Sequence, residues 1–249
     1  MEEVLKPQPQ KHVLEVLYED EEYVVVSKPS GLLTIPDRHN DQLPCLQKLV
    51  SDKFGKVFVV HRLDRDTSGA ICFARTEAAH KFLSAQFLTR TVEKYYNGLV
   101  HGRLMQPSGV VEAPLMEHPV IKGKMVVNRK GKHAISEYEV IGDWGLYSLV
   151  KVKILTGRTH QIRVHMQHLG HAIVCDPLYG TTQPVLLSGI KRKFKLSGKD
   201  LDESPLLSRL ALHSSTLKFT TEAGKVIEVE APLPKDMRAV VSQLNKWAK

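Results

Sequence analysis

Short apolar segments rich in β-branched and aromatic residues recur along most of this 249-residue chain, and turn-forming residues separate them. The first two, residues 13–18 and 23–27, flank an acidic turn at 19–22, which predicts a β-hairpin. Proline and glycine soon after Lys28 end the second strand, because proline fixes φ and glycine permits positive φ. A chain with this pattern is predicted to fold mainly as an antiparallel sheet.

Similar patterns continue toward the C-terminus. Further strands are expected at residues 57–60, 70–74, 94–102, 126–154, 210–220 and 225–232. Apolar side chains at helical spacing predict helices at 77–88, 159–170 and 236–247. Thr76 and Thr159 are the predicted N-caps of the first two helices. The sequence therefore predicts an α+β fold, a single mixed and mainly antiparallel β-sheet domain with flanking helices.

Domain organisation follows from the absence of repeats and long linkers in the sequence. We expect an N-terminal tail at residues 1–12 and one folded domain at 13–249. The stretch 188–205 is polar and rich in lysine, and it interrupts the strand pattern. We therefore expect it to be an inserted basic loop that is mobile and lies on the surface.

Charge and composition restrict the class of protein. The net charge of +8 and the pI of about 9.3 favour a polyanionic partner, although many basic proteins bind none. The three cysteines form no CxxC pair, so we expect buried thiols and neither disulfides nor a thiolate zinc site. The chain has no apolar signal segment and no apolar run long enough to span a membrane, which predicts a soluble cytoplasmic protein.

Residues 61–69, HRLDRDTSG, place two carboxylates and two guanidinium groups in a loop between two apolar strands. A solvated, salt-bridged turn is one interpretation, because charge clusters are common on protein surfaces. The other is an aspartate kept ionised by neighbouring arginines and used as a nucleophile or a base. The spacing alone does not choose between them.

A second cluster, LTGRTHQIRVH at residues 155–165, places arginine and histidine at the start of a predicted helix. The positive end of the helix dipole and its free N–H groups suit a phosphate or a carboxylate. The alternative is that Arg158 and Arg163 merely pair with surface acids.

These residues carry a resemblance to a known family. HRLDRDTSG resembles the catalytic motif of RluA-type pseudouridine synthases, and GRTHQIRVH at 157–165 resembles the third motif of that family. Further matches are LYEDEEYVVVSKPSGLL at 17–33, EKYYNGLVHG at 93–102, KMVVNRKGKHAISEYEV at 124–140, HAIVCDPLYG at 171–180 and RLALHSSTLKF at 209–219. They occur in the order of the family and span about residues 13–237. The resemblance implies the pseudouridine synthase catalytic fold and the isomerisation of uridine to pseudouridine in RNA.

The resemblance also implies roles for individual residues. Asp64 corresponds to the essential aspartate, and Arg163 is expected to pair with it and lower its pKa. Tyr96 is expected to stack on the target uracil and to assist proton transfer, with Tyr95 as the adjacent alternative. Because side chains alternate along a strand, only one of the two tyrosines should face the pocket. Ile162 is expected to form an apolar wall.

Other residues are expected to contact RNA. By the resemblance, Arg62 fills the space left when the target base leaves its stack. Lys28 and Arg158 are either structural or in contact with phosphate. Gly98 departs from the alanine that is common in relatives, which should not abolish the chemistry. Candidate phosphate contacts are Lys122, Lys124, Arg129, Lys130, Lys132, Lys191, Arg192, Lys193, Lys195 and Lys199.

The expected partner is structured RNA, either transfer RNA or ribosomal RNA, and the expected protein is a monomer. The reaction requires neither a cofactor nor a metal ion. A metal-dependent hydrolase is a competing interpretation, suggested by His160, His165, His168 and His171, but their spacing does not form a familiar zinc site. A second competitor is an RNA-binding module without catalytic activity.

Overall fold

The computed structural model describes residues 14–195 and 202–248, so the tail expected at 1–12 lies outside the described residues. Its strands are β1 (Glu15–Glu19), β2 (Tyr23–Lys28), β3 (Phe58–Val59), β4 (Ser68–Ala74), β5 (Glu93–His101), β6 (Ser108–Glu112), β7 (Leu115–Glu117), β8 (Met125–Val127), β9 (Ile135–Asp143), β10 (Tyr147–Ile154), β11 (Leu212–Thr220) and β12 (Val226–Glu230). Its helices are α1 (Leu46–Phe54), α2 (Glu77–Thr89), α3 (Gln161–His168), α4 (Leu187–Ile190) and α5 (Lys235–Trp247).

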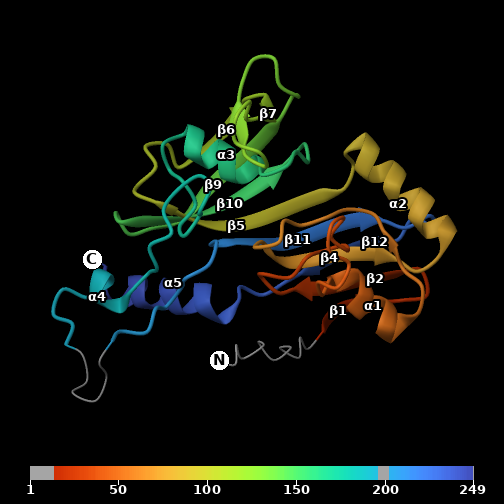
Figure 1. Cartoon of the computed structure of the whole chain (residues 1–249), viewed down its shortest axis with the longest axis horizontal. Coiled ribbons are helices and arrows are strands. Elements are labelled where there is room, and N and C mark those ends of the chain that lie inside the picture. The colour runs from red at the N-terminus through yellow and green to blue at the C-terminus, as the bar shows by residue number, and fades with distance from the viewer. Residues whose placement is uncertain (1–13, 196–201, 249) are drawn as a thin grey trace, which may run out of the picture.

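One large sheet runs through the molecule in the strand order β1-β2-β4-β11-β5-β10-β9-β6, with β3 joined to β4 and β12 joined to β11 (Figure 1). Among the described strands of this sheet, β4 and β11 are the one parallel pair, and the other pairs are antiparallel. Strands β7 and β8 form a separate small sheet. The predicted α+β class and the predicted hairpin of β1 and β2 are confirmed.

Helices cover both faces of the sheet around β2. Val24 and Val26 belong to the apolar cluster that includes residues of α1 and α5, whereas Tyr23 and Val25 belong to the cluster that includes Leu83 of α2. Figure 1 shows α2 on one side of the strands and α1 and α5 on the other. Because both faces are covered, β2 is a nearly continuous apolar run and not an alternating one.

The parallel contact of β4 with β11 determines where distant segments meet. Gly69 of β4 lies beside Ser214 of β11, and Ser214 lies opposite Tyr96 of β5. Tyr96 in turn lies opposite Val152 of β10, whose end leads into α3. The loop before β4, the middle of β5 and the start of α3 therefore meet at one place in the sheet.

The helix boundaries agree only in part with the sequence prediction. Thr76 caps α2 as expected, because its hydroxyl accepts the N–H of Ala79 at 3.1 Å. Thr159 does not cap α3, so that prediction is wrong. His160 has a left-handed backbone with φ of 55° and interrupts the helix, which begins at Gln161. The carboxamide oxygen of Gln161 accepts the Arg158 N–H at 3.0 Å and holds the preceding loop in place.

Two further segments differ from expectation. Helix α1 was not predicted, although its buried Leu46 and Val50 are spaced as on one helical face. The segment 188–205 was predicted to be a surface loop, but its first residues belong to helix α4, where Ile190 is buried. Backbone hydrogen bonds between Val185 and Leu207 join the two ends of this segment. The mobility of the segment stays a prediction.

Candidate active site

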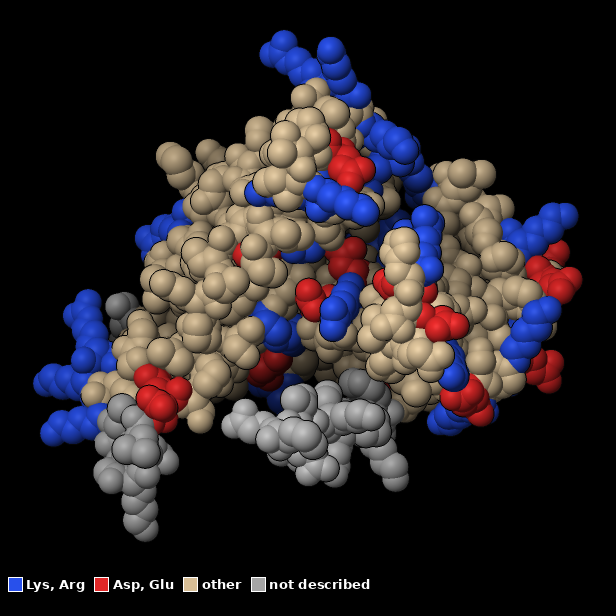
Figure 2. All heavy atoms as spheres, viewed as in Figure 1, with Lys and Arg blue, Asp and Glu red and all other residues tan. Residues whose placement is uncertain are grey.

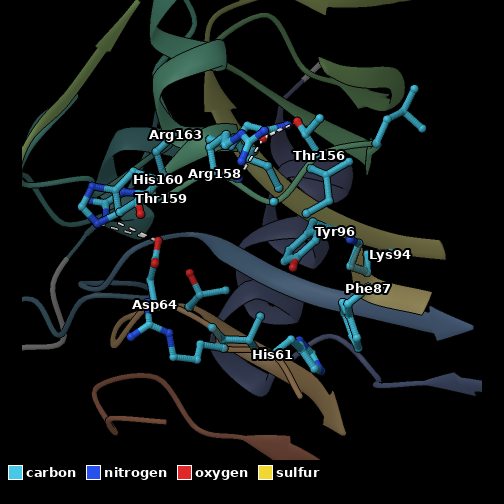
Figure 3. Close-up of a pocket in the computed structure, with 18 of the residues that line it drawn as sticks. His61, Asp64, Phe87, Lys94, Tyr96, Thr156, Arg158, Thr159, His160 and Arg163 are labelled. Carbon is cyan, nitrogen blue, oxygen red and sulfur yellow. Dashed lines mark hydrogen bonds and ion pairs between the residues drawn. The ribbon is translucent and has the colours of Figure 1, made fainter. Parts of the chain in front are cut away.

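A pocket of about 680 Å³ opens where the loop before β4, the end of α2, β5 and the start of α3 meet (Figure 3). Six of the seven site residues predicted from the sequence line it, namely Arg62, Asp64, Tyr96, Arg158, Ile162 and Arg163. A pocket of this volume is in the range that takes a small-molecule-sized group.

The carboxylate of Asp64 lies between two nitrogen donors of the α3 segment. Its Oδ2 atom is 3.8 Å from Nη1 of Arg163 and 3.8 Å from Nε2 of His160. The Asp64 side chain is 34% exposed, whereas that of Arg163 is 5% exposed. A carboxylate with cationic and N–H groups on one side and an open pocket on the other suits work as a nucleophile or a base.

Arg163 makes its strongest contacts with a residue other than Asp64. Its Nε and Nη2 atoms donate to the two carboxylate oxygens of Asp176 at 2.7 and 2.8 Å. The expected pairing with Asp64 is thus present only as a longer contact, and Asp176 holds the guanidinium in place. Asp176 was not assigned a role from the sequence, although it lies in the HAIVCDPLYG segment that matches the family.

His160 is a second neighbour of Asp64 that sequence reasoning did not assign to the reaction. Its Nδ1 atom lies 2.9 Å from the hydroxyl of Tyr179. Burial lowers the pKa of His160, and the charge of Asp64 acts in the opposite direction. The imidazole is therefore predicted to be mostly neutral near pH 7.

Tyr95 and Tyr96 point to opposite faces of β5, as strand alternation requires. Tyr96 is buried and lines the pocket, and Figure 3 shows its ring across from Asp64. Burial and the charge of Asp64 both raise the pKa of Tyr96, so its phenol stays neutral. Tyr95 instead donates its hydroxyl to Glu93 at 2.8 Å.

The remaining basic residues differ in their surroundings. Arg62 is exposed at the pocket, and Arg158 donates from Nε to the carbonyl of His133 at 3.0 Å. Lys28 does not line the pocket, because it is fully buried and donates to the carbonyls of Pro29, Leu32 and Arg65. The sequence left open whether Lys28 is structural or contacts phosphate. Its buried position and its hydrogen bonds to carbonyls are those of a structural residue.

Lysine and arginine side chains gather at the tip of the lobe that carries β7 and β8 (Figure 2). The exposed basic residues of this lobe are Lys122, Arg129, Lys130 and Lys132. A hollow with both acidic and basic side chains lies below this tip in the same view. The basic tip of the lobe is the part of this face that attracts a polyanion.

Metal ligands do not assemble in the described part of the chain, where no three His, Cys, Asp or Glu side chains lie close enough to hold an ion. The three cysteines are free and buried, as expected. Within residues 14–195 and 202–248, no helix has the length and apolar character needed to cross a membrane.

Comparisons with known proteins show the family of this chain. A family model described as RNA pseudouridylate synthase matches residues 22–168. Over 238 residues the chain is 35% identical to ribosomal large subunit pseudouridine synthase D of Nitrosomonas europaea, covering 93% of this chain and 65% of that protein. Over 251 residues it is 34% identical to the protein of the same name from Zymomonas mobilis, covering 95% of this chain and 74% of that protein.

A solved structure gives the same result. Human RNA pseudouridylate synthase domain containing 4 has a TM-score of 0.71 at 26% identity, and the match covers 93% of each chain. The family model matches more than half of this chain, and the chain covers about three quarters of the Zymomonas protein. The chain belongs to the RluA-type family of RNA pseudouridine synthases, which are isomerases.

Proposed function

We propose that this chain converts uridine to pseudouridine in structured RNA, with large-subunit ribosomal RNA as its first substrate and Asp64 as the reactive carboxylate. The observation that carries the proposal is the position of Asp64, between Arg163 and His160 and facing a pocket that Tyr96 lines. The names of the bacterial relatives support ribosomal RNA as the substrate. Transfer RNA is the second candidate.

The reaction breaks the N1–C1′ bond, turns the uracil within the pocket and joins C5 to C1′. One proton leaves C5 and one proton is gained at N1, so the reaction needs no external reactant. Asp64 acts as a nucleophile or a base in this proposal, and the guanidinium of Arg163 lies 3.8 Å from its Oδ2 atom. Tyr96 stacks on the uracil and Ile162 supplies an apolar wall, which keeps the free base bound.

A stacked uracil cannot reach Asp64, so the base must leave its stack, at a cost of a few kcal/mol. Arg62 is exposed at the pocket, and in this proposal its planar guanidinium fills the vacated space. Arg158 lies on the same pocket and contacts the RNA backbone in this proposal. Lys28 has no direct role in RNA binding.

Phosphate contacts with the β7–β8 lobe supply much of the affinity in this proposal. The lobe carries exposed lysine and arginine side chains, and each phosphate contact releases counterions. Affinity should therefore fall steeply as salt rises. A salt-insensitive affinity would contradict this part of the proposal.

The proposal includes three further statements about the chain. Residues 13–249 act as one catalytic domain, the protein acts as a monomer, and it acts in the cytoplasm on ribosomal RNA. Pseudouridine maps of total RNA from cells with and without this gene test the substrate and separate ribosomal from transfer RNA.

The central test is the substitution Asp64→Asn, with Asp66→Asn as the matched control from the same loop. Transcripts of large-subunit ribosomal RNA are incubated with each protein, and pseudouridine is separated from uridine by chromatography of the nucleosides. Asp64→Asn should abolish pseudouridine formation and change RNA affinity by no more than a few fold, whereas Asp66→Asn should stay active. Pseudouridine formation by Asp64→Asn at the rate of the unaltered protein refutes the proposal.

A further inference from the structure

Tyr179 contacts both of the groups that face Asp64. Its ring lies 4.9 Å from the guanidinium carbon of Arg163, and its hydroxyl lies 2.9 Å from Nδ1 of His160. Tyr179 is 3% exposed and follows Asp176 by three residues, so one short segment holds both neighbours of Asp64. The reaction described above assigns no role to either Tyr179 or His160.

The hydrogen bonds of Tyr179 favour one position for the proton of His160. The backbone N–H of Met125 donates to the Tyr179 hydroxyl oxygen at 2.7 Å. The phenol has a single O–H to donate, and within the described residues its other hydrogen-bond partner is Nδ1 of His160. Tyr179 is buried, so its O–H is left without an acceptor unless Nδ1 accepts it, and the surroundings therefore favour Nδ1 as the acceptor. In a neutral imidazole the ring proton is then on Nε2, the atom that faces Asp64 at 3.8 Å.

The backbone of His160 has an uncommon conformation. His160 has φ of 55°, a left-handed conformation that non-glycine residues rarely adopt and that persists only where the surroundings fix it. Cys175, next to Asp176, has φ of 56°. Two uncommon backbone conformations therefore lie in the two segments that place the neighbours of Asp64.

The charges of Asp64, Asp66, Asp176 and Arg163 act on His160. The three carboxylates favour an imidazolium, whereas burial and Arg163 disfavour it, and the net result is a lowered pKa. A neutral imidazole with its proton on Nε2 is a hydrogen-bond donor to a carboxylate. The separation of 3.8 Å exceeds a hydrogen bond, and catalytic hydrogen bonds often tighten to normal length in the complex with substrate.

We propose that Tyr179 and His160 are positioning residues for the isomerisation: the Tyr179 hydroxyl holds His160 with its proton on Nε2, and this N–H orients the Asp64 carboxylate toward the substrate. The inference rests on the proposed function of Asp64. It adds a second, neutral donor to the charged donor Arg163, and both donors face the same oxygen, Oδ2 of Asp64.

The first test is Tyr179→Phe, which keeps the ring that packs on Arg163 and removes only the hydroxyl. We expect kcat to fall by about 10- to 100-fold, as when a residue that orients a reactive group is removed, with KM and RNA affinity unchanged. The matched control is Tyr23→Phe, because the buried Tyr23 hydroxyl has no hydrogen-bond partner among the described residues. Unchanged kcat in Tyr179→Phe overturns the inference, and so does a loss that is matched by an equal loss of RNA affinity.

Two variants of His160 separate the donor from the backbone. In His160→Gln the amide nitrogen reaches about as far as Nε2, so most of the activity should remain. His160→Asn suits the left-handed backbone but is too short to reach Asp64, so kcat should fall as in Tyr179→Phe. Equal activity of the two variants overturns the inference.

Nitrogen-15 spectra of histidine-labelled protein near pH 8 provide a readout that does not depend on activity. The His160 signals, assigned by comparison with His160→Gln, should show a protonated Nε2 in the unaltered protein and a mixture of tautomers in Tyr179→Phe. A protonated Nδ1 in the unaltered protein overturns the inference. Activity retained by Asp64→Asn would refute the proposed function instead, and it leaves the tautomer measurement unaffected.

Discussion

Arg163 and Asp176 form a buried bidentate ion pair, with Nε 2.7 Å from Oδ2 and Nη2 2.8 Å from Oδ1. The Oδ1 atom of Asp176 also accepts the backbone N–H groups of Leu178 and Tyr179. With Nε and Nη2 occupied, Nη1 is the atom that faces Asp64. The position of the guanidinium beside the reactive carboxylate is therefore set by an acid 13 residues away along the chain.

The substitution Asp176→Asn should destabilise the protein by about 3–5 kcal/mol, because it removes the charge of the bidentate partner of the buried Arg163. Urea unfolding measures the loss. The matched control is Asp236→Asn, which breaks the bidentate pair of Arg209 and Asp236. In that pair Nε and Nη2 of Arg209 each lie 2.7 Å from a carboxylate oxygen, but the two side chains are 20% and 33% exposed. That loss should be about 1 kcal/mol. Equal losses would show that burial does not determine the strength of the pair.

The role of Asp176 illustrates which site residues a sequence shows. Asp64, Tyr96 and Arg163 stand in motifs that resemble a family, and all three line one pocket. Asp176 stands in an apolar segment, where an acid is uncommon unless it is paired. Its position in that segment was the feature of the sequence that indicated a buried ion pair. Its partner could not be identified, because the contact depends on how the segment after α3 folds back.

Lys28 shows the opposite case, a basic residue near the motifs that does not face the pocket. Its Nζ atom donates to the carbonyls of Pro29, Leu32 and Arg65 at 3.0, 2.7 and 2.8 Å. Lys28→Met fills a similar volume but leaves three carbonyls without this donor, so we expect a loss of at least about 3 kcal/mol in urea unfolding. RNA affinity of the folded protein should not change.

Lys122→Met is the control for Lys28→Met, because Lys122 is exposed on the β7–β8 lobe. It should weaken RNA binding and reduce the salt dependence of that binding, with stability unchanged. A Lys28→Met protein that is fully stable but binds RNA weakly would contradict the structural role of Lys28.

The sheet itself was predictable only in its local parts. The hairpin of β1 and β2 follows from two apolar runs and an acidic turn, and the capped helix α2 follows from Thr76 and the spacing after it. The contact of β4 with β11 joins Gly69 to Ser214, which are far apart in the sequence and carry no pattern that pairs them. This contact is what brings the Asp64 loop next to Tyr96.

That contact predicts a strong effect of Gly69→Ala. Gly69 has φ of 114°, and a Cβ atom there would overlap the backbone of Ser214. We expect a loss of more than about 3 kcal/mol in unfolding free energy, together with loss of activity, because β4 and β11 must separate. Circular dichroism during urea unfolding measures the first effect.

Gly98→Ala is the control for Gly69→Ala, and it introduces the alanine that the resemblance to the family implies at this position. Its Cβ would lie 3.0 Å from Cδ1 of Ile173, the end of a side chain that can move, and within ordinary contact of Leu212 and Val150. We expect stability within about 1 kcal/mol of the unaltered protein, since alanine also restricts the unfolded chain. A larger loss at Gly98 than at Gly69 would contradict the importance of the contact of β4 with β11.

His61 predicts how stability depends on pH. Its Nε2 atom accepts the N–H of Cys72 at 3.0 Å, and its ring stacks on Phe87, so the folded protein favours the neutral imidazole. Burial, with a smaller effect from Lys94, lowers the pKa of His61 to about 3, whereas the unfolded chain has the ordinary value near 6.5. Between these values the unfolded state binds more protons, so stability is lost as the pH falls from 6.5 toward 3.

Urea unfolding at several pH values should show a slope of up to about 1.4 kcal/mol per pH unit from the titration of His61. In His61→Gln, whose carboxamide oxygen still accepts the Cys72 N–H, the slope should be smaller by about that amount. His165 and His213 also have a pKa lowered by burial and keep their own contributions, so the difference between the two proteins isolates His61. The same slope in both would mean that His61 is protonated in the folded state.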